Sequence, residues 1–484
     1  MLSTPSRSAV TSFAAFLALS IAWMATIPLF AGPDEPANFI KAAAVVRGEL
    51  VGESIPPSVS TSFWSTYVDI DPRFGTAQLV PWCFVGQPQT PACDAPLETL
   101  SPVEPARTDM GRYPPFGFVP AGVGTFFGPS DWGVRGARLT LALACCGLLT
   151  LAAELLRRRD RSLVPLLVAA TPGVIFLSSV TSPSGLEVTA AIAAWSALWL
   201  GIDERWKRTS TFVTFIGTAS LLVVTRPAGI VSLAVMAAVA LMADARPWFD
   251  AFRRRWHHPV VLVSACAVSL IWYVAVYSHN TGVDLDVESR VSDVGTIVSR
   301  SFADLPRLIG ESIGNFGWLD TPSPAFVVWG FVAIVAGLGW RTVRTSNPRR
   351  RAALAIAVVG VPMWHLALNI NYQDLLGTFG AQGRHLTPLI VGIPLAATMH
   401  RRTALVDSML TTIILFFHAW CVLAALRRYA TGSVGDDLFG FVRQPEWTPP
   451  LGIGLTLLVI AVTHVVAWLA LRPARATPRS SVGG

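Results

Sequence analysis

Charged residues are scarce in this chain, and cysteine motifs are missing. Only 14% of the 484 residues are Asp, Glu, Lys or Arg, whereas a soluble globular domain carries about 25%. No Cys-x-x-Cys pair or Cys/His cluster occurs, so the sequence holds no zinc-type metal motif. It also lacks a basic stripe with interleaved aromatic residues, which argues against nucleic-acid binding. With 52% hydrophobic residues, the composition is that of an integral membrane protein.

Long apolar runs predict an all-α polytopic protein, a single membrane domain over residues 1–484. A helix needs about 20 apolar residues to cross a bilayer, and the pattern predicts about twelve spans. They are Ala9–Phe30, Val134–Leu156, Ser162–Val180, Leu186–Gly201, Phe212–Thr225, Ala228–Met242, Val260–Tyr277, Ala325–Trp340, Ala352–Asn369, His385–Met399, Ala404–Leu426 and Leu451–Leu471. The first run is too long for the apolar part of a signal peptide, so we expect it to be retained. The run Phe116–Phe127 is too short to span, and we expect it to be re-entrant or interfacial.

The distribution of basic residues predicts the orientation. Short clusters such as Arg157–Arg161, Arg253–Arg255 and Arg341–Arg351 alternate with apolar runs, as lysine and arginine do in cytoplasmic loops. Both termini are then cytoplasmic in a bacterial inner (plasma) membrane. The long polar segments 31–115 and 279–323 become extracytoplasmic loops with juxtamembrane helices. Arg427 and Arg428 fall on the outer side and are the one clear exception.

The most informative stretch follows the first span. Asp34 and Glu35 precede Pro36, which suits the first turn of a helix. Apolar spacing predicts an amphipathic helix over Pro36–Arg47, lying along the outer surface. The two acids have two interpretations. They are helix caps, or one is a catalytic general base while the second holds a divalent cation, Mg or Mn, against a leaving phosphate.

Two of the six cysteines stand apart from the apolar runs. Cys83 and Cys93 lie in a polar, proline-rich loop of the first long segment. In an oxidising compartment they would form a disulfide. The other four lie in apolar runs, where cysteine behaves as a small buried hydrophobe.

Gln382, Arg384 and His385 mark the outer end of a predicted span. Arginine binds phosphate through planar, bidentate hydrogen bonds, so Arg384 is a candidate ligand of a lipid phosphate. Alternatively it is an interfacial anchor.

Four further residues are candidates at outer helix ends. Tyr113 either stacks on a sugar ring or belongs to the aromatic belt. Asp320 either positions the acceptor or a metal, or caps the Thr321–Pro322 turn. Glu187 and Arg226 are also placed where they would line a cavity.

Several of these residues belong to segments that resemble a known family. The sequence is similar to domain-of-unknown-function family 2142, a family of bacterial membrane proteins, in five segments. They are Asp34–Phe39, Tyr113–Pro115, Val134–Arg138, Gly317–Pro322 and Gln382–His385. Asn38 and His385 stand where that family often has His and Tyr. The family resembles the GT-C membrane glycosyltransferases in layout, which implies an acidic residue in the first outer loop and a polyprenyl-phosphate sugar donor.

These observations predict a membrane glycosyltransferase. Asp34 and Glu35 would be catalytic, and Tyr113, Asp320, Gln382, Arg384 and His385 would bind substrate. The sugar would pass from a polyprenyl-phosphate donor to an envelope glycan, glycolipid or protein. The alternative is a flippase or exporter of lipid-linked saccharides, which would need essential charges along the full membrane depth. A scaffold subunit of an envelope-synthesis complex is a third reading without a positive signal.

Overall fold

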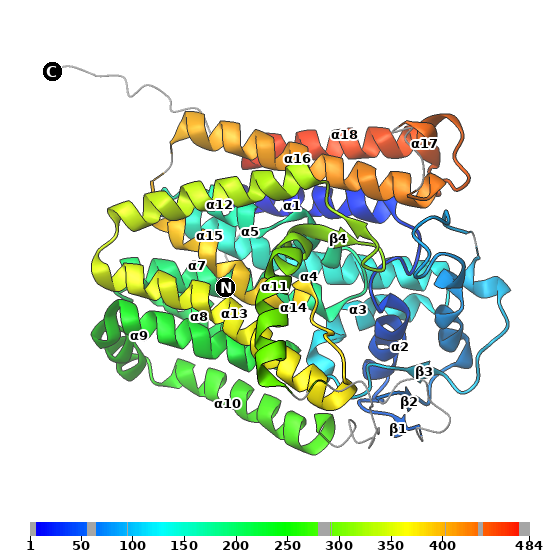
Figure 1. The fold of residues 1–484 in the computed structure, drawn as a ribbon, viewed down its shortest axis with the longest axis horizontal. Helices are drawn as coiled ribbons and strands as arrows, with labels where there is room; N and C mark the ends of the chain where they lie inside the picture. The colour runs from blue at the N-terminus through cyan, green and yellow to red at the C-terminus, as the bar shows by residue number, and fades with distance from the viewer. Residues whose placement is uncertain are drawn as a thin grey trace.

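Helices dominate the structure. The computed structural model describes residues 6–55, 64–93, 95–278, 291, 293–401, 403–433 and 439–473. Most of the long helices lie side by side in a bundle, with a smaller set of elements at one end (Figure 1). The helices are α1 (Arg7–Thr26), α2 (Glu35–Val45), α3 (Val119–Gly124), α4 (Asp131–Arg157), α5 (Val164–Ala169), α6 (Pro172–Leu177), α7 (Pro183–Asp203), α8 (Thr209–Thr225), α9 (Gly229–Arg254), α10 (His257–Trp272, extended by a π-helical turn Tyr273–Tyr277), α11 (Val294–Gly314), α12 (Ala325–Thr345), α13 (Pro348–Leu376), α14 (Gly383–Ile390), α15 (Gly392–Leu395), α16 (Ala404–Thr431), α17 (Gly440–Arg443) and α18 (Gly452–Leu471).

The polytopic all-α prediction is confirmed, whereas the count of twelve spans is not. Nine helices in the described residues are long and apolar enough to cross a membrane, namely α1, α4, α7, α9, α10, α12, α13, α16 and α18. A further apolar helix, α8, has only 17 residues. The two remaining predicted spans, 162–180 and 385–399, are broken into short helices.

Proline explains both breaks, because it removes a backbone donor and clashes with the preceding turn. Pro172 begins α6 after the end of α5, and Pro394 in α15 lacks the N–H group that would bond to Ile390, the last residue of α14. Two indole groups of α7 hydrogen-bond to carbonyl groups of the second broken segment. Trp195 Nε1 donates to the carbonyl of Pro388 at 2.9 Å, and Trp199 Nε1 donates to that of Gly392 at 3.0 Å. Irregular backbone is tolerated at membrane depth where protein surrounds it, and α7 is almost entirely buried.

A small cap covers one end of the bundle. It contains α2, α3, α11 and a three-stranded antiparallel sheet of β1 (Glu53–Ser54), β2 (Thr66–Tyr67) and β3 (Arg107–Thr108). A second short pair joins β4 (Asn315–Phe316) to β5 (Thr321–Pro322). The helix predicted over 36–47 exists as α2. Its predicted place on the surface is wrong, because all of its residues are buried beneath the surrounding cap segments. We call this end of the bundle the loop end.

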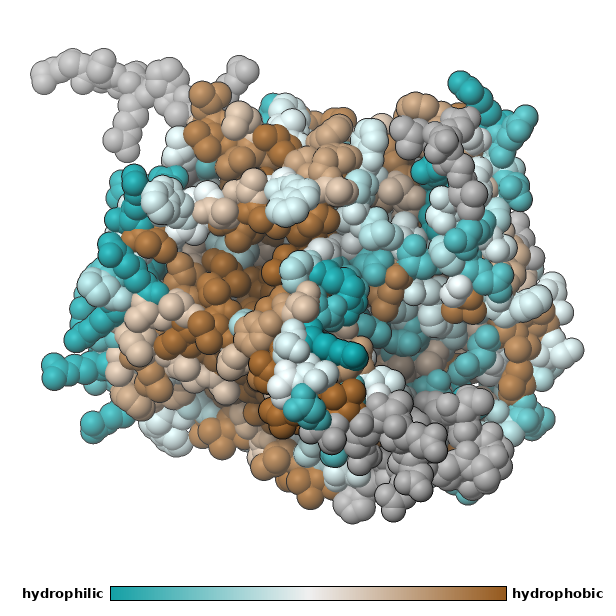
Figure 2. Space-filling view, viewed as in Figure 1, coloured by the Kyte–Doolittle hydropathy of each residue, from teal (hydrophilic) through white to brown (hydrophobic). Residues whose placement is uncertain are grey.

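The opposite end, which we call the basic end, carries the arginine clusters. The connections after α4, α7, α9 and α12 lie there, at the left of Figure 1. Figure 2 shows a broad apolar band between a charged margin at the basic end and a mixed polar surface at the loop end. A band of exposed apolar side chains is what contact with lipid requires.

Candidate functional site

A tight turn places the two acidic residues at the loop end. Asp34 has a φ of 57°, in the left-handed region that Asp and Asn tolerate better than most residues. Gly32 allows the close approach of a neighbouring segment, because a Cβ there would lie 2.8 Å from the Val180 side chain. The helix α2 then begins at Glu35. Asp34 makes no side-chain cap, so the capping interpretation does not apply to it.

Glu35 points into the protein and is fully buried. Arg138 Nε and Nη2 donate to Glu35 Oε1 and Oε2 at 2.7 and 2.8 Å. The backbone N–H groups of Thr181 and Gly32 donate to the same two oxygens, each at 2.9 Å. Four hydrogen bonds therefore occupy the carboxylate, which holds α2, α4 and the start of α7 together. Glu35 does not line the cavity described below.

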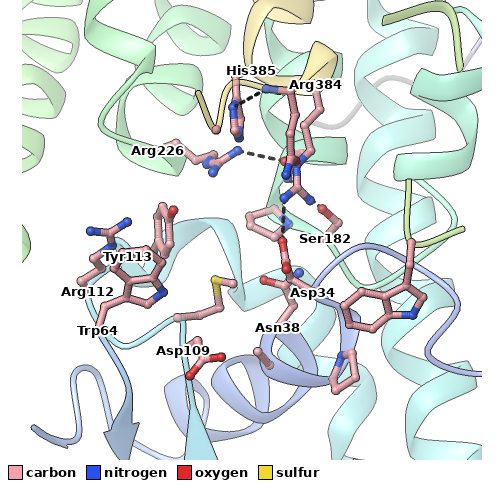
Figure 3. A pocket seen from close by; sticks show the side chains of 18 of the residues that line it. Asp34, Asn38, Trp64, Asp109, Arg112, Tyr113, Ser182, Arg226, Arg384 and His385 are labelled. Carbon is pink, nitrogen blue, oxygen red and sulfur yellow. Dashed lines mark hydrogen bonds and ion pairs between the residues drawn. The ribbon is translucent and has the colours of Figure 1, made fainter. Parts of the chain in front are cut away.

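The Asp34 side chain points away from Glu35 and forms an ion pair with Arg384, which lies in the N-terminal turn of α14. Arg384 Nη2 donates to Asp34 Oδ2 at 2.6 Å, although the residues are 350 positions apart. Figure 3 shows the two side chains approaching from opposite walls of a cavity. The Asp34 side chain is 39% exposed and that of Arg384 is 12% exposed. The carboxylate is therefore reachable, while the guanidinium is largely withdrawn from solvent.

A polar cavity of about 420 Å³ surrounds this ion pair. Its lining residues are Asp34, Pro36, Ala37, Asn38, Trp64, Gln78, Pro81, Val85, Asp109, Met110, Arg112, Tyr113, Ser182, Pro183, Ser184, Arg226, Trp318, Tyr372, Leu376, Gly380, Gln382, Arg384 and His385. Four of them present buried polar atoms without a hydrogen-bond partner in the described structure: Asn38 Oδ1, Arg112 Nε and Nη1, Gln382 Oε1 and Arg384 Nε. Such atoms are expensive to bury unless a ligand or water satisfies them.

Tyr113 lies at a side wall of the cavity between two arginines. The guanidinium carbons of Arg112 and Arg226 lie 5.4 and 5.2 Å from the centre of its ring. Although burial acts to raise the pKa of the phenol, the two positive charges lower it below its usual value. Arg226 Nη1 also donates to Ser184 Oγ at 3.0 Å and pairs with Glu187 at 3.4 Å.

A second hollow of about 530 Å³ adjoins the first, and the two share Tyr113, Arg226, Tyr372 and His385. Its remaining walls are mainly apolar and come from α9, α10 and α13. They include Ile230, Val231, Leu270, Tyr273, Leu368 and Leu375. Leu270 is 56% exposed, so this hollow reaches the apolar outer surface of the bundle. A polar chamber and an apolar groove therefore meet at one wall.

Asp320 lies outside the cavity, contrary to the substrate-binding role predicted for it. Its carboxylate accepts from Arg428 Nη2 at 2.8 Å and from Thr321 Oγ1 at 3.0 Å. Burial and pairing with Arg428 make it part of the framework. The same Gly317–Pro322 segment still reaches the site through Trp318, which lines the cavity and donates to the Phe30 carbonyl at 3.0 Å.

The disulfide predicted from the sequence is present in the structure. Cys83 and Cys93 are bonded, with their Cα atoms 6.5 Å apart. The loop between them surrounds Arg428, whose guanidinium donates to the carbonyls of Phe84, Gln87 and Thr90.

The structure thus brings together Asp34, Tyr113, Gln382, Arg384 and His385 from the predicted site and excludes Glu35 and Asp320. Sequence reasoning missed Asn38, Trp64, Asp109, Arg112, Trp318 and Tyr372. Two of these had a signal: Asn38 lies one helical turn after Asp34, and Arg112 adjoins Tyr113. Nothing in the sequence distinguished Trp64 or Asp109.

The fold and the cavity define a polytopic helical membrane protein with a polar chamber at one end of its bundle. The structure is similar to two crystal structures of ArnT from Cupriavidus metallidurans, one bound to undecaprenyl phosphate and one in the apo state. The TM-score is 0.43 for both, at 14% and 15% identity, over 96% and 93% of this chain and 75% and 73% of the ArnT chains. The family model described as "Predicted membrane protein (DUF2142)" matches residues 17–393, and the chain belongs to this family.

The matched range contains all five segments on which the resemblance was based, so that prediction is confirmed. No curated protein matches the chain.

Proposed function

We propose that this protein is a membrane glycosyltransferase that moves a sugar from a polyprenyl-phosphate donor to a hydroxyl of a cell-envelope acceptor on the extracytoplasmic face. The observation that supports it best is the meeting of Asp34 and Arg384 on the wall of a polar cavity. A carboxylate and a guanidinium at this spacing suit a reaction in which a proton is removed and a phosphate departs.

The adjoining apolar groove suits the lipid part of the donor. A polyprenyl phosphate is apolar along its chain and charged at one end. The groove reaches the outer surface through Leu270, and Arg226 lies where it meets the polar cavity. In this arrangement the chain lies among α9, α10 and α13, the phosphate meets Arg226 and Arg384, and the sugar enters the polar cavity.

The proposed reaction needs few groups. The donor phosphate replaces Asp34 as the partner of Arg384, which frees the carboxylate. Asp34 takes the proton of the acceptor hydroxyl as its oxygen bonds to the anomeric carbon. The bond from that carbon to the phosphate oxygen breaks, and the phosphate leaves with the electron pair. Arg384 and Arg226 stabilise the charge that accumulates on it.

Glu35 has a positioning role in this proposal. Its four hydrogen bonds, two of them from Arg138, hold the turn that presents Asp34. The sequence also predicted that Asp34 and Glu35 bind Mg or Mn. The occupied Glu35 carboxylate does not support that role for it, and the described residues contain no group of three or more His, Cys, Asp or Glu side chains that could hold a metal. No step of the proposed reaction uses one.

The first prediction compares Asp34→Asn with Glu35→Gln in purified protein given defined polyprenyl-phosphate sugars and envelope acceptors. Asn tolerates the left-handed backbone at position 34, so Asp34→Asn should cost less than about 1 kcal/mol of stability. Loss of a general base should lower the rate of transfer by about 10²- to 10⁴-fold. Glu35→Gln should instead lower the free energy of unfolding by about 3–5 kcal/mol, because it leaves Arg138 buried without its carboxylate partner.

Thermal unfolding and sugar release are measured on the same preparations. Full activity of Asp34→Asn would refute the assignment of the base. If neither wild type nor variant releases sugar, while lipid-linked saccharide still crosses a vesicle membrane, the flippase interpretation replaces this one.

A further inference from the structure

Four arginines in the described structure are buried, and three of them have a carboxylate partner. Arg138 pairs with Glu35, Arg350 with Asp203 and Arg428 with Asp320. Arg226 and Arg384, which are slightly more exposed, also have carboxylate partners in Glu187 and Asp34. Pairing is expected, because an isolated buried charge is strongly unfavourable.

Arg112 is the fourth buried arginine and differs from the others in its partners. The residue is 5% exposed, and no carboxylate lies within ion-pair distance in the described structure. Its Nε and Nη1 atoms have no hydrogen-bond partner. The Arg112 backbone is fixed, since its carbonyl accepts from Trp272 Nε1 at 2.9 Å. Among the described residues, Arg112 is thus a buried cation in a defined position without a carboxylate partner.

Aromatic rings surround the guanidinium. The Arg112 guanidinium carbon lies 3.9 Å from the centre of the Trp64 ring and 4.5 Å from that of Tyr277. Cation–π contacts stabilise the charge but use none of the N–H groups. Nε–H and Nη1–H therefore remain as donors, and each can make a charge-assisted hydrogen bond to an anion in the cavity.

The position of Arg112 separates it from the Asp34–Arg384 pair. Figure 3 shows Arg112, Trp64 and Tyr113 grouped at one side of the cavity, and Arg384 entering from another wall beside Ser182. Trp64 and Tyr113 also line the cavity and offer aromatic surface on which the apolar face of a sugar can pack.

We propose that Arg112 forms a second anion subsite, which binds a carboxylate or phosphate on a sugar ring of the substrate. The site would thus select an anionic sugar, such as a uronic acid or a phosphorylated hexose, in addition to the lipid phosphate. This inference rests on the proposed function for the identity of the substrate. Its test uses binding alone, so inactivity as a transferase would leave the test intact.

The second prediction concerns stability. Arg112→Gln should leave the melting temperature of the purified protein unchanged or raise it, because the variant removes a buried charge that has no carboxylate partner among the described residues. Arg138→Gln, the matched change at a paired arginine, should lower the melting temperature. A fall for Arg112→Gln as large as that for Arg138→Gln would make Arg112 a framework residue and overturn the proposal.

The binding experiment separates the two anion sites. Ligand-observed NMR titrations compare glucuronic acid and glucose 6-phosphate with glucose, and farnesyl phosphate reports on the lipid-phosphate site. Wild type should bind at least one of the anionic sugars about tenfold more tightly than glucose. Arg112→Gln should abolish that preference and leave farnesyl phosphate binding unchanged.

Arg73→Gln provides the control, since Arg73 lies in the same long segment, is exposed and does not line the cavity. It should behave as wild type. A wild type without preference, an Arg112→Gln variant that keeps it, or one that loses farnesyl phosphate binding would each overturn the proposal. The last result would assign Arg112 to the lipid phosphate.

Discussion

Lys41 shows how the cap is held together at the level of one residue. Its side chain is fully buried within α2, and Nζ donates to the carbonyls of Leu50 and Gly111. These bonds connect α2 to the segments before β1 and after β3. Burial lowers the pKa of Lys41 to about 7, against the opposing effect of Glu49.

The third prediction follows from that pKa. An unfolded chain keeps Lys41 protonated up to about pH 10.4, so between about pH 7 and 10 the unfolded state binds more protons than the folded state. Stability therefore rises with pH across this window. The melting temperature of wild type, measured relative to Lys41→Met, should increase from pH 7 to pH 10. A pH-independent difference would show that Lys41 keeps its charge when folded.

The adjacent residues Asp34 and Glu35 show which properties of a site can be predicted from the sequence and which cannot. The pattern singled out Asp34 and Arg384 as candidate site residues, and the structure brings their side chains into contact. It could not separate Asp34 from Glu35. Their roles depend on a left-handed turn and on Arg138, which lies over a hundred positions away. The proposed anion subsite could not be predicted for the same reason, since Arg112 is distinctive only because no carboxylate pairs with it among the described residues.

At the level of elements, the structure accounts for Arg428, one of the two residues that depart from the positive-inside pattern. The residue lies near the end of α16 at the loop end, where basic residues are not expected. Its charge faces the protein, paired with Asp320 and bonded to three carbonyls of the disulfide loop. It therefore fastens that loop to the bundle. A rule about solvated loop charges does not cover a buried arginine of this kind.

The fourth prediction is a double-mutant cycle between Arg428 and Asp320. Arg428→Gln should lower the free energy of unfolding by about 3–5 kcal/mol, because it leaves the Asp320 carboxylate buried and unpaired. Asp320→Asn should cost less, since Arg428 keeps its three carbonyl partners. Denaturant unfolding of both singles and the double variant gives a coupling energy, expected at about 1–3 kcal/mol. A coupling near zero would mean that the carbonyls alone hold Arg428.

Helix boundaries also show which breaks the apolar pattern does not predict. Long single helices such as α4 and α16 were predicted closely, because a continuous apolar run leaves few alternatives in a membrane. The segments 162–180 and 385–399 look equally apolar, yet they are broken. Both segments pack against α7, and two indoles of α7 donate to carbonyls of the second segment. Hydropathy alone does not report such tertiary contacts.

For the whole molecule, charge asymmetry sets the expected orientation. Arginine clusters gather at the basic end, and the cavity, the cap and the disulfide lie at the loop end. If the positive-inside rule holds, the loop end faces away from the cytoplasm. The proposed function depends on this orientation, because a lipid-linked sugar donor and an envelope acceptor would meet there.

The fifth prediction tests the orientation with single cysteines. Thr99 at the loop end and Lys207 at the basic end are both exposed. In a Cys266→Ser background, Thr99→Cys should react with a membrane-impermeant maleimide in intact spheroplasts, and Lys207→Cys should react only after the membrane is opened. The buried Cys145, Cys146 and Cys421 should stay unlabelled and serve as internal controls. Reversed labelling would place Asp34 and its cavity in the cytoplasm. The proposed extracytoplasmic transfer would then be untenable, whatever the variants at Asp34 and Arg112 show.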